Sequence, residues 1–353
     1  MTIQRIGFAC KWIDHPEQVD GIKPDDGCRP LNTYTTTKAW LGRQTQADAR
    51  DKMDEIVSKN MHGLLKLVEL VASLRPDGRM LRISSDILPM YTEPTFGKFY
   101  QDNTVRKWIS SMFRKIGDQA RAHDVRLSFH PGQFTVLASD NPEIVDKSIQ
   151  EFEYHVDMAR WMGYGQSFQD FKINVHISGK RGPQGIRDAL KRISREGRNC
   201  ITIENDENSW GIEHSLELVN DCALVLDIHH HWVRDGEHIM PYDDRIKRIQ
   251  DSWRGVRPVI HYSMYKRQWH HYAGEDYLDT KWTMAPRDAI IEGGVARGKL
   301  RAHSAFFWHE ACNEWALSHG EWADIMCESK GKNIAAEDLR YQRLMSRYIK
   351  RDY

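Results

Sequence analysis

The 353-residue sequence predicts an α/β fold, a single TIM (β/α)8 barrel. Two observations favour this fold. Short apolar strands alternate with helical stretches about eight times, and ionisable residues stand near the C-terminal end of most predicted strands, where such barrels carry their active sites. A doubly wound sheet would instead draw its chemistry from few strands at one switch point. The sequence has no G-x-G-x-x-G after the first strand and no phosphate-loop lysine motif.

The predicted strand within residues 126–134 shows this pattern most clearly, with the sequence Arg-Leu-Ser-Phe-His-Pro-Gly-Gln-Phe. Alternation places two apolar side chains on one face and His130 on the opposite, polar face. The Pro-Gly pair that follows ends the strand in a tight turn. The strand therefore ends in a histidine, and the turn after it presents Gln133 and Phe134.

Five later strands repeat the arrangement, each with a residue that can bind a metal opposite its aliphatic positions. These residues are His176, Glu204, Asp227, His261 and Glu328. Together with the first histidine they predict a site assembled at one end of a sheet. Imidazole and carboxylate ligands without thiolate suit Mn²⁺, Zn²⁺ or Fe²⁺. Two such ions, about 3.5–4 Å apart, serve in-line attack on phosphodiesters.

The other elements follow from periodicity and from turn residues. A first strand at 5–10 leads into a long loop, 11–44, and then into a helix at about 46–74 with apolar positions at helical spacing. We expect further strands within 80–86, 171–179, 200–206, 223–231, 258–263 and 323–329. We expect further helices at about 104–123, 141–162, from 184, 213–220, 243–253, 301–317 and 335–349. Residues 1–353 form one predicted domain, with an insert at 264–320 and a C-terminal helix at 333–353.

Composition excludes some classes of protein. The formal net charge is zero, so a nucleic-acid partner would need a local basic face. No apolar run approaches the roughly 20 residues of a membrane span, and the N-terminal residues show no signal-peptide pattern. Six cysteines without C-x-x-C spacing indicate buried thiols in a reducing compartment. We therefore expect a cytoplasmic, nucleoid-associated protein, a monomer with no membrane partner.

Several segments together resemble the UV damage endonuclease family, UVDE. They are Leu127-Ser-Phe-His-Pro-Gly-Gln133, Val175-His-Ile-Ser-Gly179, Ile203-Glu-Asn-Asp-Glu207, Asp227-x-x-His-His231 and Glu328-Ser-Lys-Gly-Lys332, with Ile83-Ser-Ser-Asp-Ile-Leu-Pro89 at the second strand. The resemblance spans almost the whole chain. It implies a TIM barrel related in fold to endonuclease IV and xylose isomerase, with a cluster of two or three Mn²⁺ ions. It also implies incision of damaged double-stranded DNA immediately 5′ to UV photoproducts and other lesions, leaving a 3′-hydroxyl and a 5′-phosphate.

The resemblance also implies roles for particular residues. The metal ligands that it implies are His130, His176, Glu204, Asp227, His230, His261, His271 and Glu328, of which Glu204, His130, His261 and Glu328 are expected to be catalytic. Glu204 would be the bridging carboxylate. Alternation from Asp227 instead favours His229, so the choice within 229–231 stays open. The last histidine matches His270 or His271, and we prefer His271 because Arg267 then falls where a basic residue precedes it.

Gln133 and Phe134 match the pair that probes the lesion in the family, where the second residue is tyrosine. Other residues expected to contact DNA or the lesion are Phe8, Trp12, Lys180, Arg181 and Lys330. Phe8 and Trp12 stand where the family has a tyrosine and an asparagine. Glu93 stands where it has a histidine, and Val259 where it has a lysine that can be carboxylated. The residues that match the family's metal ligands are thus kept, whereas the residues at the family's lesion contacts and outer metal ligands differ.

Two other functions remain as alternatives. A metal-dependent sugar isomerase on the same barrel would need a general acid–base pair over an open-chain sugar. A lesion-binding homologue that has lost the chemistry would bind UV-treated DNA without cutting it.

Overall fold

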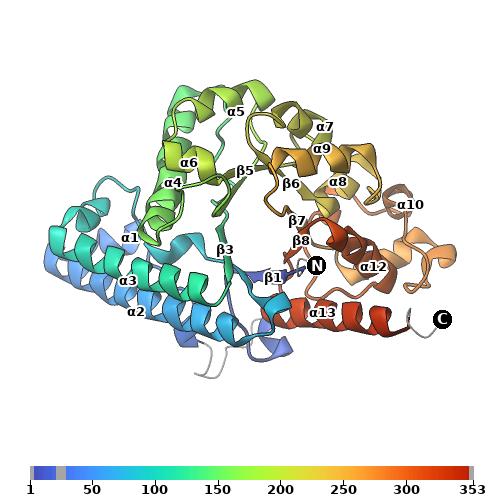
Figure 1. Ribbon diagram of the computed structural model, residues 1–353, viewed down its shortest axis with the longest axis horizontal. Coiled ribbons are helices and arrows are strands. Elements are labelled where there is room, and N and C mark those ends of the chain that lie inside the picture. The colour runs from blue at the N-terminus through green and yellow to red at the C-terminus, as the bar shows by residue number, and fades with distance from the viewer. Residues whose placement is uncertain (1–3, 21–28, 350–353) are drawn as a thin grey trace.

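The computed structural model describes residues 4–20 and 29–349, and within these the chain forms a closed barrel of parallel strands (Figure 1). Each strand pairs with the next along the chain, and the first pairs with the last. The strands are β1 (Ile6–Ala9), β2 (Met80–Arg82), β3 (Arg126–Phe129), β4 (Lys172–His176), β5 (Ile201–Glu204), β6 (Ala223–Asp227), β7 (Val259–Tyr262) and β8 (Asp324–Cys327). The predicted barrel is confirmed.

Helices surround the strands, and the long α2 and α3 lie side by side along one flank (Figure 1). The helices are α1 (Lys38–Leu41), α2 (Gln46–Ser73), α3 (Asn103–Ala122), α4 (Pro142–Trp161), α5 (Gly182–Leu190), α6 (Arg195–Cys200), α7 (Ile212–Ser215), α8 (Ile228–Asp235), α9 (Asp244–Ser252), α10 (Arg287–Glu292), α11 (Arg297–Leu300), α12 (Glu310–Ser318) and α13 (Lys332–Ile349). Short 3₁₀ helices include η6 (Leu216–Leu218) and η7 (Arg267–Ala273). No helix in the described part of the chain is long and apolar enough to cross a membrane.

Two predicted helices differ from those observed. The stretch expected at 301–317 becomes helical only at Glu310, where the ring of His309 accepts a hydrogen bond from the backbone of Cys312 and caps α12. The helix expected at 213–220 is one α-helical turn, α7, followed by η6. Of the predicted C-terminal helix, residues 350–353 lie outside the described residues. Cys28 does too, and the other five cysteines are free thiols.

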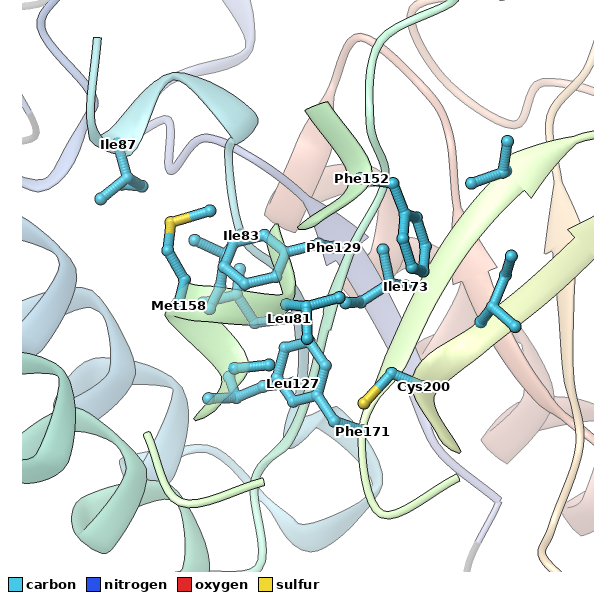
Figure 2. Close-up of a cluster of buried hydrophobic side chains, with 14 of the residues drawn as sticks. Leu81, Ile83, Ile87, Leu127, Phe129, Phe152, Met158, Phe171, Ile173 and Cys200 are labelled. Carbon is cyan, nitrogen blue, oxygen red and sulfur yellow. The ribbon is translucent and has the colours of Figure 1, made fainter. Parts of the chain in front are cut away.

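The main core lies between the outward face of the strands and the inward face of the helices. Figure 2 shows one part of it, in which Phe129 of β3 and Ile173 of β4 lie near Phe152 and Met158 of α4, all fully buried. Apolar residues alternate along these strands, so every second side chain enters this layer. The side chains between them point into the barrel, and this fixes which residues reach the site.

The N-terminal end of the barrel is closed by a buried ion-pair cluster. Asp324, at the start of β8 and fully buried, receives a hydrogen bond from Nη1 of Arg126 at 2.8 Å and from Nε of Arg257 at 2.8 Å. The backbone N–H of Arg5 donates to the same carboxylate at 2.9 Å, and Nη1 of Arg5 lies 3.7 Å from it. One carboxylate therefore compensates guanidinium groups from β3, from the chain before β7 and from the chain before β1.

Replacing this carboxylate should destabilise the barrel. In Asp324→Asn the guanidinium groups lose their shared anion, and breaking a buried pair in this way costs about 3–5 kcal/mol of the free energy of unfolding. Urea denaturation measures this change. The matched control is Asp124→Asn: Asp124 also pairs with Arg5, but its side chain is 82% exposed, so the loss should stay below about 1 kcal/mol. Equal losses in both variants would contradict this assignment.

Candidate metal centre

The metal-capable residues converge at the C-terminal mouth of the barrel because all eight strands run in the same direction. His176 and Glu204 are the last residues of β4 and β5 and lie opposite each other in the strand register. Asp227, the last residue of β6, lies opposite His261 of β7. His130 and Glu328 follow directly after β3 and β8. The structure therefore brings these six predicted residues together.

Glu204 lies at the centre of this group and is fully buried. Its Oε1 is 3.0 Å from Nδ1 of His261, and its Oε2 is 3.2 Å from Nε2 of His130. Nε2 of His176 lies 3.8 Å from the same Oε2. The side-chain amide of Asn174 donates to that oxygen as well. The two oxygens thus face different imidazoles across the mouth.

Four sets of three residues each bring one ligand atom per residue within 4.8 Å of the others. They are His130, His261 and Glu328; His130, His176 and Glu204; His176, Glu207 and His230; and Glu204, Asp227 and His261. Glu204 belongs to two of the sets, which is the arrangement that a bridging carboxylate needs. The nitrogen and oxygen donors suit a divalent cation of the first transition row.

The hydrogen bonds of the histidines orient their free nitrogens toward the centre. In His130, Nδ1 lies 2.9 Å from the carbonyl oxygen of Pro131, which can only accept, so Nδ1 carries the proton and Nε2 turns a lone pair toward Glu204. His176 places Nδ1 3.3 Å from a carboxylate oxygen of Asp206 and Nε2 toward Glu204. A histidine held by an acceptor on one nitrogen and free on the other is the usual state of a metal ligand.

Unpartnered oxygens support the same fit. Oδ2 of Asp227 and Oε2 of Glu207 are buried and have no hydrogen-bond donor in the described structure. Nδ1 of His230 lies 3.2 Å from the carbonyl oxygen of Asn205, while its Nε2 faces the free Glu207 oxygen at 3.6 Å. Buried acceptors without donors are rare and costly, and cations bound in the two sets that contain them would satisfy both oxygens. The residues present therefore fit a metal cluster.

The pKa values in the mouth reflect burial and crowded charges. Burial is the largest influence on Asp227 and raises its pKa to about 8, with the charge of Glu204 adding to the rise. Burial would lower the pKa of His230, but the carboxylates of Asp227, Glu204 and Glu207 raise it to about 10. Burial would raise the pKa of Glu204, yet His261 and the other imidazoles hold it well below its usual value. A cation bound at Asp227 and His230 would therefore displace protons from them.

The structure separates the three consecutive histidines. Asp227 ends β6 and caps α8, with its side chain accepting from the backbone N–H of His230 at 2.7 Å. The chain therefore turns helical at once, and strand alternation stops applying. His230 faces Glu204, whereas Nε2 of His229 lies 3.0 Å from the carbonyl oxygen of Leu300. The alternation that favoured His229 was wrong for this reason.

The preference for His271 is corrected by the structure. His271 is exposed, its ring lies against Tyr272, and none of the candidate metal sets among the described residues includes it. His270 uses both ring nitrogens on the Tyr265 hydroxyl and the Tyr277 carbonyl.

His303 is the histidine of the insert that lies near the centre. Burial lowers its pKa, and the charge of Glu328 opposes that shift while the charge of His230 adds to it. The insert places His303 there through a bridge to Tyr265, just after β7. Sequence reasoning missed it because nearly 40 residues separate the two bridge partners.

Sequence reasoning also missed several residues behind the ligands. Glu207 belongs to the quoted 203–207 segment but was not proposed as a ligand. Lys172 is buried with Nζ 2.9 Å from Nε2 of His261, and burial lowers its pKa to about 7. As a neutral amine, Lys172 can accept a hydrogen bond from Nε2–H of His261, which leaves the Nδ1 lone pair of His261 toward Glu204. Arg82, from β2, is paired with Glu328.

The uncharged residues that were expected to contact DNA differ in their exposure. Gln133 and Phe134 are exposed in the loop after β3, Phe134 to 84%, beside a cavity of about 770 Å³ that this loop shares with α4. Phe8 is fully buried in the core on the helix side of β1, so its expected DNA contact is corrected. Trp12 is half-buried with its ring edge-on to Phe8 at 5.7 Å between centroids.

The basic residues also differ from one another. Nζ of Lys180 lies 2.8 Å from Asp140, and Nη2 of Arg181 lies 2.6 Å from Asp188, so both cations have an anionic partner. Lys330 is exposed at the mouth, two residues after Glu328.

Two departures from the family pattern have structural roles here. Glu93 pairs with Lys38 at 2.8 Å and accepts hydrogen bonds from the backbone of its own loop. Val259 lies in an apolar cluster inside the barrel.

Comparisons with known proteins agree on one family. The family described as UV-endonuclease UvdE matches residues 5–349. The chain is 25% identical over 333 residues to the UV DNA damage endonuclease of Bacillus cereus strain B4264, covering 92% of each chain. It is 25% identical over 264 residues to that of Bacillus thuringiensis subsp. konkukian strain 97-27, covering 72% of this chain and 79% of the relative. The crystal structure of SacUVDE shares its fold with a TM-score of 0.69 at 22% identity, over 98% of this chain and 99% of that chain. This chain belongs to the UV-endonuclease UvdE family.

Proposed function

We propose that this protein is a metal-dependent DNA repair endonuclease that incises double-stranded DNA 5′ to UV photoproducts and other lesions, leaving a 3′-hydroxyl and a 5′-phosphate. The observation that carries the proposal is Glu204, a buried carboxylate whose two oxygens face separate imidazoles at the open mouth of the barrel. Family membership supports the reaction, and the relatives named above are UV DNA damage endonucleases.

The ligands in this proposal are His130, His176, Glu204, Asp227, His230, His261 and Glu328, joined by Glu207 and His303, and the cluster holds two or three Mn²⁺ ions. Divalent ions at such a site lower the pKa of water and stabilise charge on a leaving oxygen. Glu204 neutralises positive charge from both sides of the mouth. Asp206 fixes the ring of His176, and Lys172 fixes that of His261, so the ligand nitrogens are held in place before substrate arrives.

Lesion recognition belongs to the loop after β3. Gln133 and Phe134 project from the protein beside the metal centre, because His130 lies only three residues before Gln133. A damaged base stack costs less to open than an intact one. Phe134 then stacks against the bases that remain, an interaction that needs an aromatic face and no hydroxyl. Gln133 and Phe134 thus detect a distorted duplex next to a metal centre whose ligands are held in place before the DNA binds.

Glu204→Gln tests the metal centre and the reaction together. EDTA should abolish nicking of UV-treated plasmid by the parent, and added Mn²⁺ should restore it. Glu204→Gln should lose at least one bound metal by elemental analysis and about 100-fold or more in rate, without recovery in Mn²⁺. Circular dichroism should be unchanged, and the exposed Glu217→Gln serves as the matched control. Parental metal content and rate in Glu204→Gln would refute this placement of the centre.

The parent protein also tests the two alternative functions. Binding of UV-treated DNA without nicking would favour a lesion-binding homologue, and turnover of an aldose would favour a sugar isomerase.

Phe134→Ala should lose lesion-directed incision. Loss of one stacking contact worth about 1–3 kcal/mol corresponds to about 5- to 150-fold in rate on a damaged duplex. Phe134→Tyr should keep parental activity, because the aromatic face remains. The assay compares oligonucleotides with a cyclobutane dimer, a 6-4 photoproduct, an abasic site or no damage. Tyr341→Ala, which removes an aromatic side chain 64% exposed on α13, is the control. If Phe134→Ala cuts all four substrates as the parent does, this loop does not detect damage.

A further inference from the structure

A second cavity opens at the mouth of the barrel beside the metal centre, with a volume of about 460 Å³. Its walls come from the chain after β1, from the chain after β7, from the returning end of the insert and from the loop after β8. His303 lines this cavity and also lies close enough to Glu328 for the charge of that carboxylate to affect its pKa. The cavity and the metal centre are therefore neighbours that share one side chain.

Backbone hydrogen bonds build the cavity into the barrel. The N–H of Ser304 donates to the carbonyl oxygen of Met264 at 2.7 Å, which ties the insert to the end of β7. The N–H of Lys330 donates to Ser304 at 3.1 Å, and that of Gly331 to Ala305 at 2.7 Å. A Cβ on Gly331 would lie 2.6 Å from the ring of Phe306 and 2.7 Å from the Ala305 carbonyl oxygen. Only glycine permits this approach, so the wall is closely fitted to the loop after Glu328.

The charged side chains that line the cavity, within the described part of the chain, are positive. Lys266, Arg267 and Lys330 line it, and no carboxylate is among the described residues that do so. Unlike Lys180 and Arg181, these three residues form no ion pair with any described carboxylate. Because these cations have no carboxylate partner among the described residues, they favour an anionic ligand. The buried carboxylates of the metal centre lie beside them.

Two aromatic side chains also line the cavity. Phe306 and Trp308 are both half-buried, and the indole N–H of Trp308 donates to the carbonyl oxygen of Tyr265 at 3.0 Å, which fixes that ring. Aromatic faces beside free cations are the usual surroundings of a nucleotide, because each base offers a π-face and each phosphate a charge. The volume lies within the range of sites that enclose a small organic ligand.

We propose that this cavity binds one nucleotide of the substrate DNA next to the phosphate that is cut. Lys266, Arg267 and Lys330 contact its phosphate, and Phe306 and Trp308 contact its base or sugar. This inference rests on the proposed function. It assigns the insert a role in holding the DNA strand against the metal centre, and it identifies Lys266 and Arg267 as DNA-binding residues.

The double variant Lys266→Gln/Arg267→Gln tests the cavity through binding alone. The probe is a fluorescent, undamaged DNA duplex, titrated with the full-length protein between about 50 and 200 mM salt. The plot of log affinity against log salt should become shallower by a slope of about one, because the two side chains contact the same phosphate. Affinity at the lowest salt should fall at least about tenfold. Metal content and the thermal unfolding midpoint should stay at the parental values.

Two further variants control for charge and for side-chain shape. Lys266→Arg/Arg267→Lys keeps both charges and should keep the parental slope. Lys52→Gln/Lys59→Gln removes two charges from α2, where both pair with Glu55, and should also keep it. An unchanged slope in Lys266→Gln/Arg267→Gln contradicts the subsite alone, since incision is not measured. A parent that binds no duplex contradicts the subsite and the proposed function together.

Discussion

Removing a carboxylate from water costs several kcal/mol unless cations or hydrogen-bond donors compensate for it. Glu204 meets this constraint at the centre of the mouth, where the buried Asp227 and the half-buried Glu328 add two more carboxylates around the same histidine, His261. Imidazoles from four strands or strand ends surround them, and their outer nitrogens are already engaged by Pro131, Asp206, Asn205 and Lys172. The inner lone pairs and the unpartnered carboxylate oxygens therefore point at one another, an arrangement that divalent cations would stabilise.

The rest of the barrel is stable enough to hold this concentration of charge at its mouth. Its N-terminal end is closed by the Asp324 cluster and its outer layer by apolar packing, so the strands are fixed independently of the mouth. In parallel strands, residues that are partners in the register lie at the same level along the barrel axis. His176 and Glu204 are such partners, and so are Asp227 and His261. The loops beyond the strands can then vary. One carries Phe134, and another, the insert, carries His303 and the basic cavity.

Strand alternation was enough to predict the barrel and to bring six metal-capable residues to one mouth, because each strand stays regular up to that residue. It failed for His229 because Asp227 begins a helix, and an aspartate three residues before His230 is itself a capping signal. It was not applied to Phe8, which shares a face with Ile6 and so packs against the helices. Alternation also places Lys172 on the face of His176. Only the fold of the insert could show that His303, and not His271, lies near the centre, since sequence separation within a long loop does not determine distance.

The proposed function depends on divalent metal bound between Glu204 and the surrounding histidines. Anomalous X-ray diffraction from crystals grown in Mn²⁺ measures this directly. We expect at least two strong anomalous peaks at the mouth of the barrel, each with ligands at about 2.0–2.3 Å and each with one carboxylate oxygen of Glu204 among them. Saturating Mn²⁺ with no anomalous peak near Glu204, or with Mn²⁺ bound only elsewhere, would contradict the account.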